Sequence, residues 1–187
     1  MPLLQTPVAA LGSKAHDFSL PGTDGRRHTL ASTRGPLGTL VMFICNHCPY
    51  VKAIQDRLVD DVKVLQKAGI GVVAISANDP AEYPEDSFPE MQKLAKQLGF
   101  TFPYLFDETQ EVAKAYGAVC TPDFFGYNAN GELQYRGRLD AAHKGPRTPE
   151  MKRELVDAML QIAKTGKAPR EQVASMGCSI KWSSPGR

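Results

Sequence analysis

The chain has 187 residues, of which 42% are hydrophobic and 22% charged, with a formal net charge of +2. This is the composition of one globular domain that can bury a full core, and a charge so near zero argues against electrostatic binding of nucleic acid. No apolar run approaches the roughly 20 residues that span a bilayer, and residues 1–11 lack a signal-peptide pattern, so we expect a cytoplasmic protein that binds neither nucleic acid nor membranes.

The predicted elements begin with an N-terminal β-hairpin. Residues 18–20 and 28–30 alternate in polarity around a glycine-containing turn. An apolar run over 39–44 then predicts a buried strand, and apolar residues spaced three or four apart predict a helix over 51–65. Residues 69–76 form the next predicted strand. This β-α-β order implies parallel pairing through a right-handed crossover.

A polar segment over residues 78–89 follows, with three prolines and four acidic residues. Its composition predicts a surface loop, and we expect the run 82–86 within it to face solvent. A helix over about 89–98 and a strand over 102–106 come next. Asp107 can cap the short helix predicted after that strand.

The remaining predicted elements are an antiparallel hairpin and a helix. A strand over 119–127, entered through Pro122, turns back into a strand over 132–137. An amphipathic helix follows Pro149, with buried positions from Met151 to Ile162.

No repeat, low-complexity stretch or linker divides the chain. We expect one domain over residues 1–165 and a C-terminal extension over 166–187 that packs on it or trails from it. Trp182, the only tryptophan, lies in this extension. Its burial would fasten the tail to the domain.

The most informative feature is Cys45-Asn46-His47-Cys48, between the apolar strand and the helix that opens at Pro49. The N–H groups and dipole of a helix N-terminus favour negative charge, so the first sulfur can ionise below the free-cysteine pKa near 8.5. Cys48 is close enough to attack a mixed disulfide at Cys45 and release the partner. The motif therefore predicts thiol-disulfide exchange, with Cys45 attacking and Cys48 resolving.

Other side chains have two interpretations each. His47, as an imidazolium, would stabilise the first thiolate, or it is an exposed histidine at a helix start. Cys120 could face the dithiol or fill the core, and Cys178 is a second resolving thiol or a tail residue. Asp17 and Asp107 could accept protons from the dithiol, although most such acids cap helices or face solvent.

Metal binding is the other use of paired cysteines. Cys45, His47 and Cys48 would hold copper or zinc in a non-catalytic carrier. A structural zinc site needs four ligands, however, and no second Cys-x-x-Cys or Cys-x-x-His accompanies this one. We therefore expect no metal, and no organic cofactor because the chain has no Gly-rich dinucleotide or phosphate loop.

The β-α-β unit with the dithiol, followed by Thr121-Pro122 before a hairpin, is similar to the thioredoxin fold. The longer pattern resembles the alkyl hydroperoxide reductase and thiol-specific antioxidant family of peroxiredoxin-like redoxins, in residues 43–52, 102–108, 115–124 and 177–182. This resemblance implies an α/β fold with a central mixed β-sheet flanked by α-helices. It also implies a thiol or disulfide protein partner, such as a thioredoxin or its reductase.

The resemblance assigns a role to Thr121 and Pro122. Pro122 would be a cis-proline beside the thiols, leaving the backbone groups before it open to a substrate chain that pairs as an added strand. Independently of the resemblance, an imidazolium of His47 beside the Cys45 thiolate would make the disulfide easier to reduce, so we expect a site more oxidising than that of thioredoxin, near −270 mV.

One departure from the family separates two activities. Peroxiredoxins carry the pattern Pro-x-x-x-Thr/Ser-x-x-Cys, in which the hydroxyl of the Thr or Ser hydrogen-bonds the peroxide. Here Met42 stands three residues before Cys45, and Cys45 stands three before Cys48, so neither position supplies a hydroxyl. Arg136 or Arg138 could offer a cation. We therefore favour disulfide exchange and keep a thiol-dependent peroxidase as the alternative.

Overall fold

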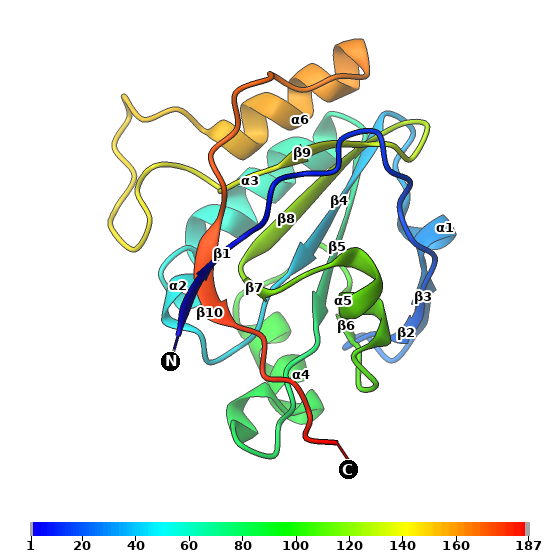
Figure 1. Cartoon of the computed structure of the whole chain (residues 1–187), viewed down its shortest axis with the longest axis vertical. Coiled ribbons are helices and arrows are strands. Elements are labelled where there is room, and N and C mark those ends of the chain that lie inside the picture. Colours follow the sequence, from blue (N-terminus) through cyan, green and yellow to red (C-terminus); the bar gives the residue numbers. More distant parts are fainter. Residues whose placement is uncertain (1, 186–187) are drawn as a thin grey trace.

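The structure is a computed structural model that describes residues 2–185. At its centre lies a five-stranded sheet in the order β6-β5-β4-β8-β9 (Figure 1). Strands β4 (Gly38–Phe43), β5 (Ile70–Ser76) and β6 (Tyr104–Phe106) are parallel to one another. Strand β8 (Asp123–Asn128) pairs antiparallel with β4, and β9 (Leu133–Arg136) pairs antiparallel with β8. The predicted α/β class with a central mixed sheet is confirmed.

Both faces of this sheet are covered, because side chains alternate along its buried strands. Leu40 and Met42 of β4 join one apolar cluster, and Val41 and Phe43 join the other. The helices α3 (Gln55–Lys67), α4 (Phe88–Gln97) and α6 (Glu154–Thr165) pack in the first cluster.

The second cluster includes α5 (Glu111–Tyr116) and the predicted hairpin, which is present as β2 (Ser19–Pro21) and β3 (Arg27–Thr29). The short helix α1 (Leu30–Thr33) follows the hairpin directly. Thr29 caps it through its hydroxyl, which accepts from Ser32 N–H.

Two predicted elements are divided. The helix expected over 51–65 is two helices, α2 (Pro49–Lys52) and α3, because the backbone tightens at Ile54, whose N–H bonds to Val51 O at 3.0 Å. The strand expected over 119–127 breaks at Pro122 into β7 (Cys120–Thr121) and β8. Proline has no N–H to donate, so the ladder cannot continue through it.

A further three-stranded sheet, not predicted, has the order β1-β10-β7 and is antiparallel throughout. It joins β1 (Leu3–Gln5) and β10 (Met176–Ser179), which Figure 1 shows side by side in blue and red. The C-terminal segment thus adds a strand beside β7.

The expected burial of Trp182 is wrong, since 42% of this residue is exposed, with Lys114 Nζ over its ring, 5.7 Å from the centroid. Hydrogen bonds from the Gln110 side chain to the backbone hold the tail instead. Gln110 donates to Lys181 O at 2.8 Å and accepts from Ser183 N–H at 2.9 Å. The apolar ring is therefore not what fastens the segment.

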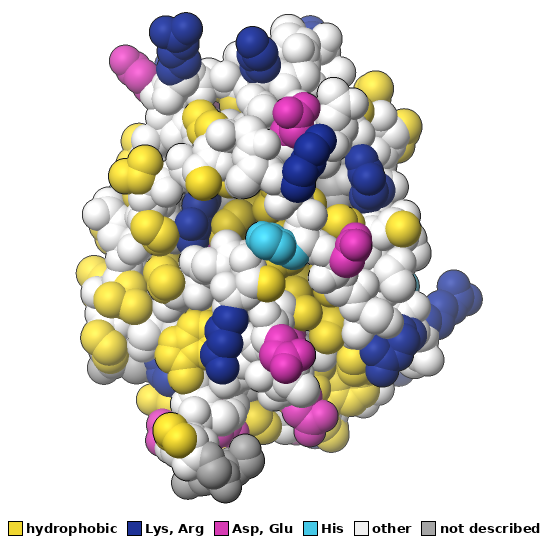
Figure 2. Space-filling model, turned by 45° about the vertical axis from the view of Figure 1, so that its right-hand side comes forward, with side chains coloured by type: hydrophobic (Ala, Val, Ile, Leu, Met, Phe, Trp, Pro, Cys, Tyr) yellow, Lys and Arg dark blue, Asp and Glu magenta, His cyan; other side chains and the backbone are white. Residues whose placement is uncertain are grey.

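Over residues 2–185, no helix is both long enough and apolar enough to cross a membrane. The face drawn in Figure 2 carries basic and acidic side chains dispersed among uncharged ones.

Candidate redox site

The two motif cysteines lie where β4 ends and α2 begins. Cys48 is the N-cap residue of α2, and Pro49 takes the first helical position, where its missing N–H costs no helical hydrogen bond. Neither Cys45 nor Cys48 has exposed surface in this conformation. The thiols lie at a helix start, as predicted, but they are buried.

Thr121 contacts both sulfurs. Its Oγ1 lies 3.4 Å from Cys45 Sγ, and its carbonyl oxygen accepts from Cys48 as a thiol, also at 3.4 Å. The peptide bond from Thr121 to Pro122 is cis. One residue at the end of β7 thus bridges the dithiol.

The two thiols share their ionisation. A hydrogen bond from Cys45 lowers the pKa of Cys48 to about 4, although burial opposes the shift. The same hydrogen bond, burial and the charge of Asp86 raise the pKa of Cys45 well above its usual range. The protons therefore leave the pair in two separate steps, and the first gives one shared negative charge at neutral pH. This differs from the expectation that the helix start would favour the anion on Cys45.

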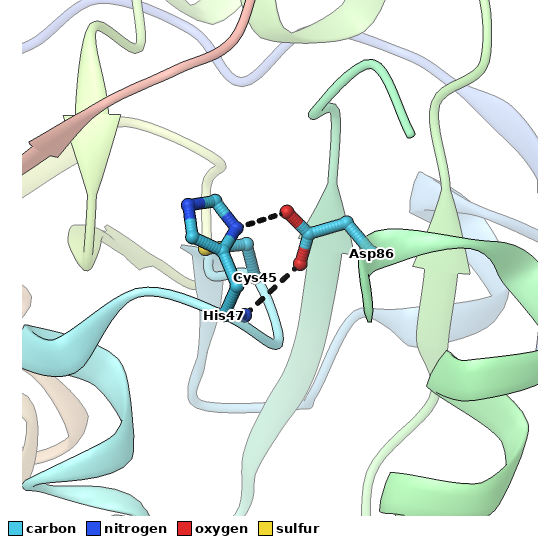
Figure 3. Close-up of side chains that lie close together, drawn as sticks. All are labelled: Cys45, His47 and Asp86. Atoms are coloured by element: carbon cyan, nitrogen blue, oxygen red, sulfur yellow. Dashed lines mark hydrogen bonds and ion pairs between the residues drawn. The ribbon is translucent and has the colours of Figure 1, made fainter. Parts of the chain in front are cut away.

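His47 is buried rather than exposed, and its partner is Asp86. The imidazole donates from Nδ1 to Asp86 Oδ2, next to the Cys45 side chain (Figure 3). A ring nitrogen, Cys45 Sγ and a carboxylate oxygen of Asp86 all lie within 4.8 Å of one another. The face of the imidazole stacks on Tyr83, with ring centroids 4.1 Å apart.

The expectation that residues 82–86 face solvent is wrong for Asp86, which is fully buried. It ends the turn η1 (Pro84–Asp86) and accepts four hydrogen bonds. The donors are the backbone N–H groups of Asn46 and His47, the imidazole, and Asn78 Nδ2. A buried carboxylate is stable only with such partners, so Asp86 fixes the loop between the cysteines.

Asp17 and Asp107, the predicted proton acceptors, serve elsewhere. Asp17 is exposed, and Asp107 is buried with Oδ2 accepting from Ala113 N–H at the start of α5, at 2.8 Å. No sequence spacing pointed to Asp86. The only hint was that two aromatic residues, Tyr83 and Phe88, flank it in an otherwise polar loop.

The C-terminal strand β10 brings Cys178 to the site. Cys178 is directly opposite Thr121 in the antiparallel pair β10–β7. Cys48 and Cys178 belong to the same buried cluster, and each shifts the pKa of the other. Burial, and then the neighbouring Cys48, raise the pKa of Cys178 to about 11.

Cys120 is also buried, and burial raises its pKa to about 12. It precedes Thr121 in β7, so its side chain points to the opposite face of that strand. Each of the two candidate cations is paired with a carboxylate. Arg136 pairs with Asp123, and Arg138 pairs with Glu154, each at 2.8 Å.

Comparison with known proteins gives the family. The model of the AhpC/TSA family matches residues 11–136. A thiol-disulfide oxidoreductase ResA from Geobacillus thermodenitrificans is 29% identical over 127 residues, 68% of this chain and 68% of that protein. Peroxiredoxin Bcp from Escherichia coli is 26% identical over 133 residues, 71% of this chain and 80% of that protein.

Solved structures agree. The crystal structure of an uncharacterized conserved protein from Geobacillus kaustophilus has a TM-score of 0.92 and 42% identity, covering 100% of this chain and 99% of that one. The thioredoxin domain of a thiol-disulfide oxidoreductase from Bacteroides vulgatus has a TM-score of 0.57 at 17% identity, covering 69% of this chain and 89% of that one. The second similarity identifies the fold as thioredoxin-like.

Proposed function

Because this chain belongs to the AhpC/TSA family, we propose that it is a thiol-disulfide oxidoreductase whose Cys45 and Cys48 exchange disulfides with a partner protein. The observation that carries the proposal is that Thr121 contacts both sulfurs, which lie where α2 begins. Two thiols that share one negative charge hold a nucleophile and a resolving group together.

In the proposed reaction, the Cys45 thiolate attacks one sulfur of the partner's disulfide, and the partner's other sulfur leaves as a thiolate. Cys48 then attacks Cys45 in the mixed disulfide. The partner leaves with two thiols, and the chain keeps the Cys45–Cys48 disulfide. A second thiol protein, such as a thioredoxin, returns the pair to the reduced form.

His47 and Asp86 act on Cys45 through position and charge. Asp86 fixes the imidazole through Nδ1, while Nε2 is buried with no hydrogen-bond partner among residues 2–185. A ring nitrogen of His47 lies within 4.8 Å of Cys45 Sγ, so a shift of the side chain during the reaction would bring it close enough to exchange a proton with the sulfur. We propose this as the tuning role of His47.

We place partner docking at Thr121 and Pro122. A hollow beside Pro122 is lined in part by Tyr50, Ile54 and Met176. Arg57, Arg138 and Asp140 also line it, so the hollow offers both apolar and charged side chains to an extended partner segment that would pair with the backbone. We propose that the protein works in the cytoplasm, where its four free cysteines would remain reduced.

Insulin reduction with dithiothreitol tests the exchange. Cys45→Ser and Cys48→Ser should each lower the rate by about 100-fold or more, because the second thiol no longer acts intramolecularly. Cys120→Ser is the matched control, since this buried cysteine points away from the dithiol, and it should keep the parental rate. Variants at 45 and 48 that match the parent would refute the proposal.

The roles of the two thiols are separated by trapping. Cys48→Ser should accumulate a mixed disulfide with a disulfide-containing peptide, whereas Cys45→Ser should not. The reverse pattern would transfer the attacking role to Cys48, which has the lower pKa.

A thiol peroxidase is the second candidate. The Thr121 hydroxyl stands 3.4 Å from Cys45 Sγ, so the missing hydroxyl of the peroxidase motif is supplied from another strand. Hydrogen peroxide would then form a sulfenic acid on Cys45, which dimedone labels. Labelling of Cys45 with turnover of peroxide would favour this candidate.

A copper or zinc carrier is the third. Asp86 adds an oxygen donor to the sulfur and imidazole donors of Cys45 and His47. Metal analysis of the reduced protein distinguishes a metal carrier from an oxidoreductase. Stoichiometric metal with loss of free thiols would favour metal binding over disulfide exchange.

A further inference from the structure

We propose that Cys178 is a built-in exchange partner of the dithiol, able to take over Cys48 from Cys45. The inference rests on the proposed function, because it requires the Cys45–Cys48 disulfide as its starting state. It assigns the C-terminal strand β10 the role of an internal substrate that regulates the site.

The register of β10 directs Cys178 to the thiols. Residues directly opposite in an antiparallel pair project their side chains to the same face. Cys178 is opposite Thr121, and the Thr121 hydroxyl is 3.4 Å from Cys45 Sγ. Cys178 therefore shares the face of β7 that contacts the dithiol, and it belongs to the same buried cluster as Cys45 and Cys48.

Backbone packing holds the strand tightly in this place. Gly177 approaches β7 so closely that a Cβ atom there would stand 1.8 Å from Thr121 O. The helix α2, which begins directly after Cys48, also contacts β10.

Strand β10 occupies the place beside β7 where we propose that a partner segment docks. Docking at Thr121 requires an extended chain beside β7, and β10 already pairs there. A partner strand would bring its own disulfide sulfur to the dithiol, and β10 brings Cys178 instead. The chain thereby occupies its docking edge with its own cysteine.

The exchange is balanced without an outside oxidant. The Cys178 thiolate attacks Cys48 Sγ in the Cys45–Cys48 disulfide, the bond between Cys45 and Cys48 breaks, and Cys45 leaves as a thiolate. The products are a Cys48–Cys178 disulfide and a nucleophilic Cys45. The new bond would also tie β10 to the start of α2 and keep the docking edge closed.

Cys120 provides a matched comparison. It is buried like Cys178 and stands one residue from Thr121, but it lies on the opposite face of β7. If proximity along the chain were enough, Cys120 would pair with Cys48 equally well. The register argument predicts that it does not.

The test uses the full chain with Cys45→Ser, oxidised with diamide, then denatured, alkylated and mapped by mass spectrometry. We expect a Cys48–Cys178 disulfide and a free Cys120 in most molecules. Cys45→Ser/Cys178→Ser should lose the intramolecular bond, and Cys45→Ser/Cys120→Ser should keep it. A Cys48–Cys120 bond, or no bond, would overturn the proposal.

A second arm tests the exchange itself. The parent chain with a Cys45–Cys48 disulfide is equilibrated in glutathione buffer, quenched with acid and mapped. A measurable Cys48–Cys178 fraction supports the relay, and its absence across all ratios of oxidised to reduced glutathione overturns it. These readouts do not involve insulin, so a chain that forms the bond but fails to reduce insulin would refute only the proposed function.

Discussion

Asp86 organises the site although it lies far from the cysteines in sequence. Its carboxylate accepts two backbone N–H groups from the loop between the cysteines and holds the imidazole of His47. The motif itself is local, so the sequence predicted where Cys45 and Cys48 would lie. Asp86 was missed because aspartate in a polar, proline-rich run is usually exposed, and only the fold brings it inside.

Replacing Asp86 with asparagine removes the negative charge. It also places an amide NH2, which is a donor, where the surrounding groups are donors that need an acceptor. We expect Asp86→Asn to lower the free energy of unfolding by about 1–3 kcal/mol. The pKa of Cys45 should also fall, because the carboxylate charge contributes to raising it. Urea unfolding and thiolate absorbance at 240 nm measure the two effects.

The control for Asp86→Asn is Glu85→Gln, the neighbouring acid, whose side chain is 66% exposed. It should leave both measurements near the parental values. Equal effects at the two positions would show that the loop responds to any loss of charge.

At the scale of elements, the long strands and helices were predictable and the small sheet was not. A strand such as β4 can be predicted from its apolar run, because both of its faces are buried. The strands β1, β7 and β10 have three, two and four residues, too few to show a period. Their pairing depends on segments from both ends of the chain, which no local pattern can reveal.

Gly177 allows β10 its close approach to β7, and this can be tested. Gly177→Ala should displace β10, because its Cβ would overlap Thr121 O, and lower the free energy of unfolding by about 1–3 kcal/mol. Hydrogen exchange of residues 176–179 should accelerate. Gly145→Ala is the control, since the nearest atom to its Cβ is Ala142 O at 3.3 Å. Unchanged exchange in Gly177→Ala would contradict the packing described for β10.

For the whole molecule, the shared ionisation of the dithiol links folding to pH. The pKa of Cys48 falls from its usual 9.0 to about 4 on folding. Between these values the unfolded chain keeps a proton that the folded chain has lost. The free energy of unfolding therefore rises with pH across this window, and the contribution of Cys48 is lost as pH falls through about 4.

Reduced parent and reduced Cys48→Ser should thus diverge in stability as pH increases from about 4 toward 9, with the parent gaining. Urea unfolding at several pH values measures the difference. Cys120→Ser should parallel the parent here, because the pKa of Cys120 is raised on folding and acts only at higher pH. A parent curve parallel to that of Cys48→Ser would show that the pair holds no anion in the folded state.

The complete burial of Cys45 and Cys48 also governs the kinetics of the site. A reagent can reach either sulfur only when the part of the structure that covers it opens locally, and such openings have their own equilibrium and rate. At low partner concentration, turnover would scale with the fraction of open molecules. At high concentration it would reach a ceiling set by the opening rate, so the cover rather than the sulfur chemistry would limit the speed of electron transfer.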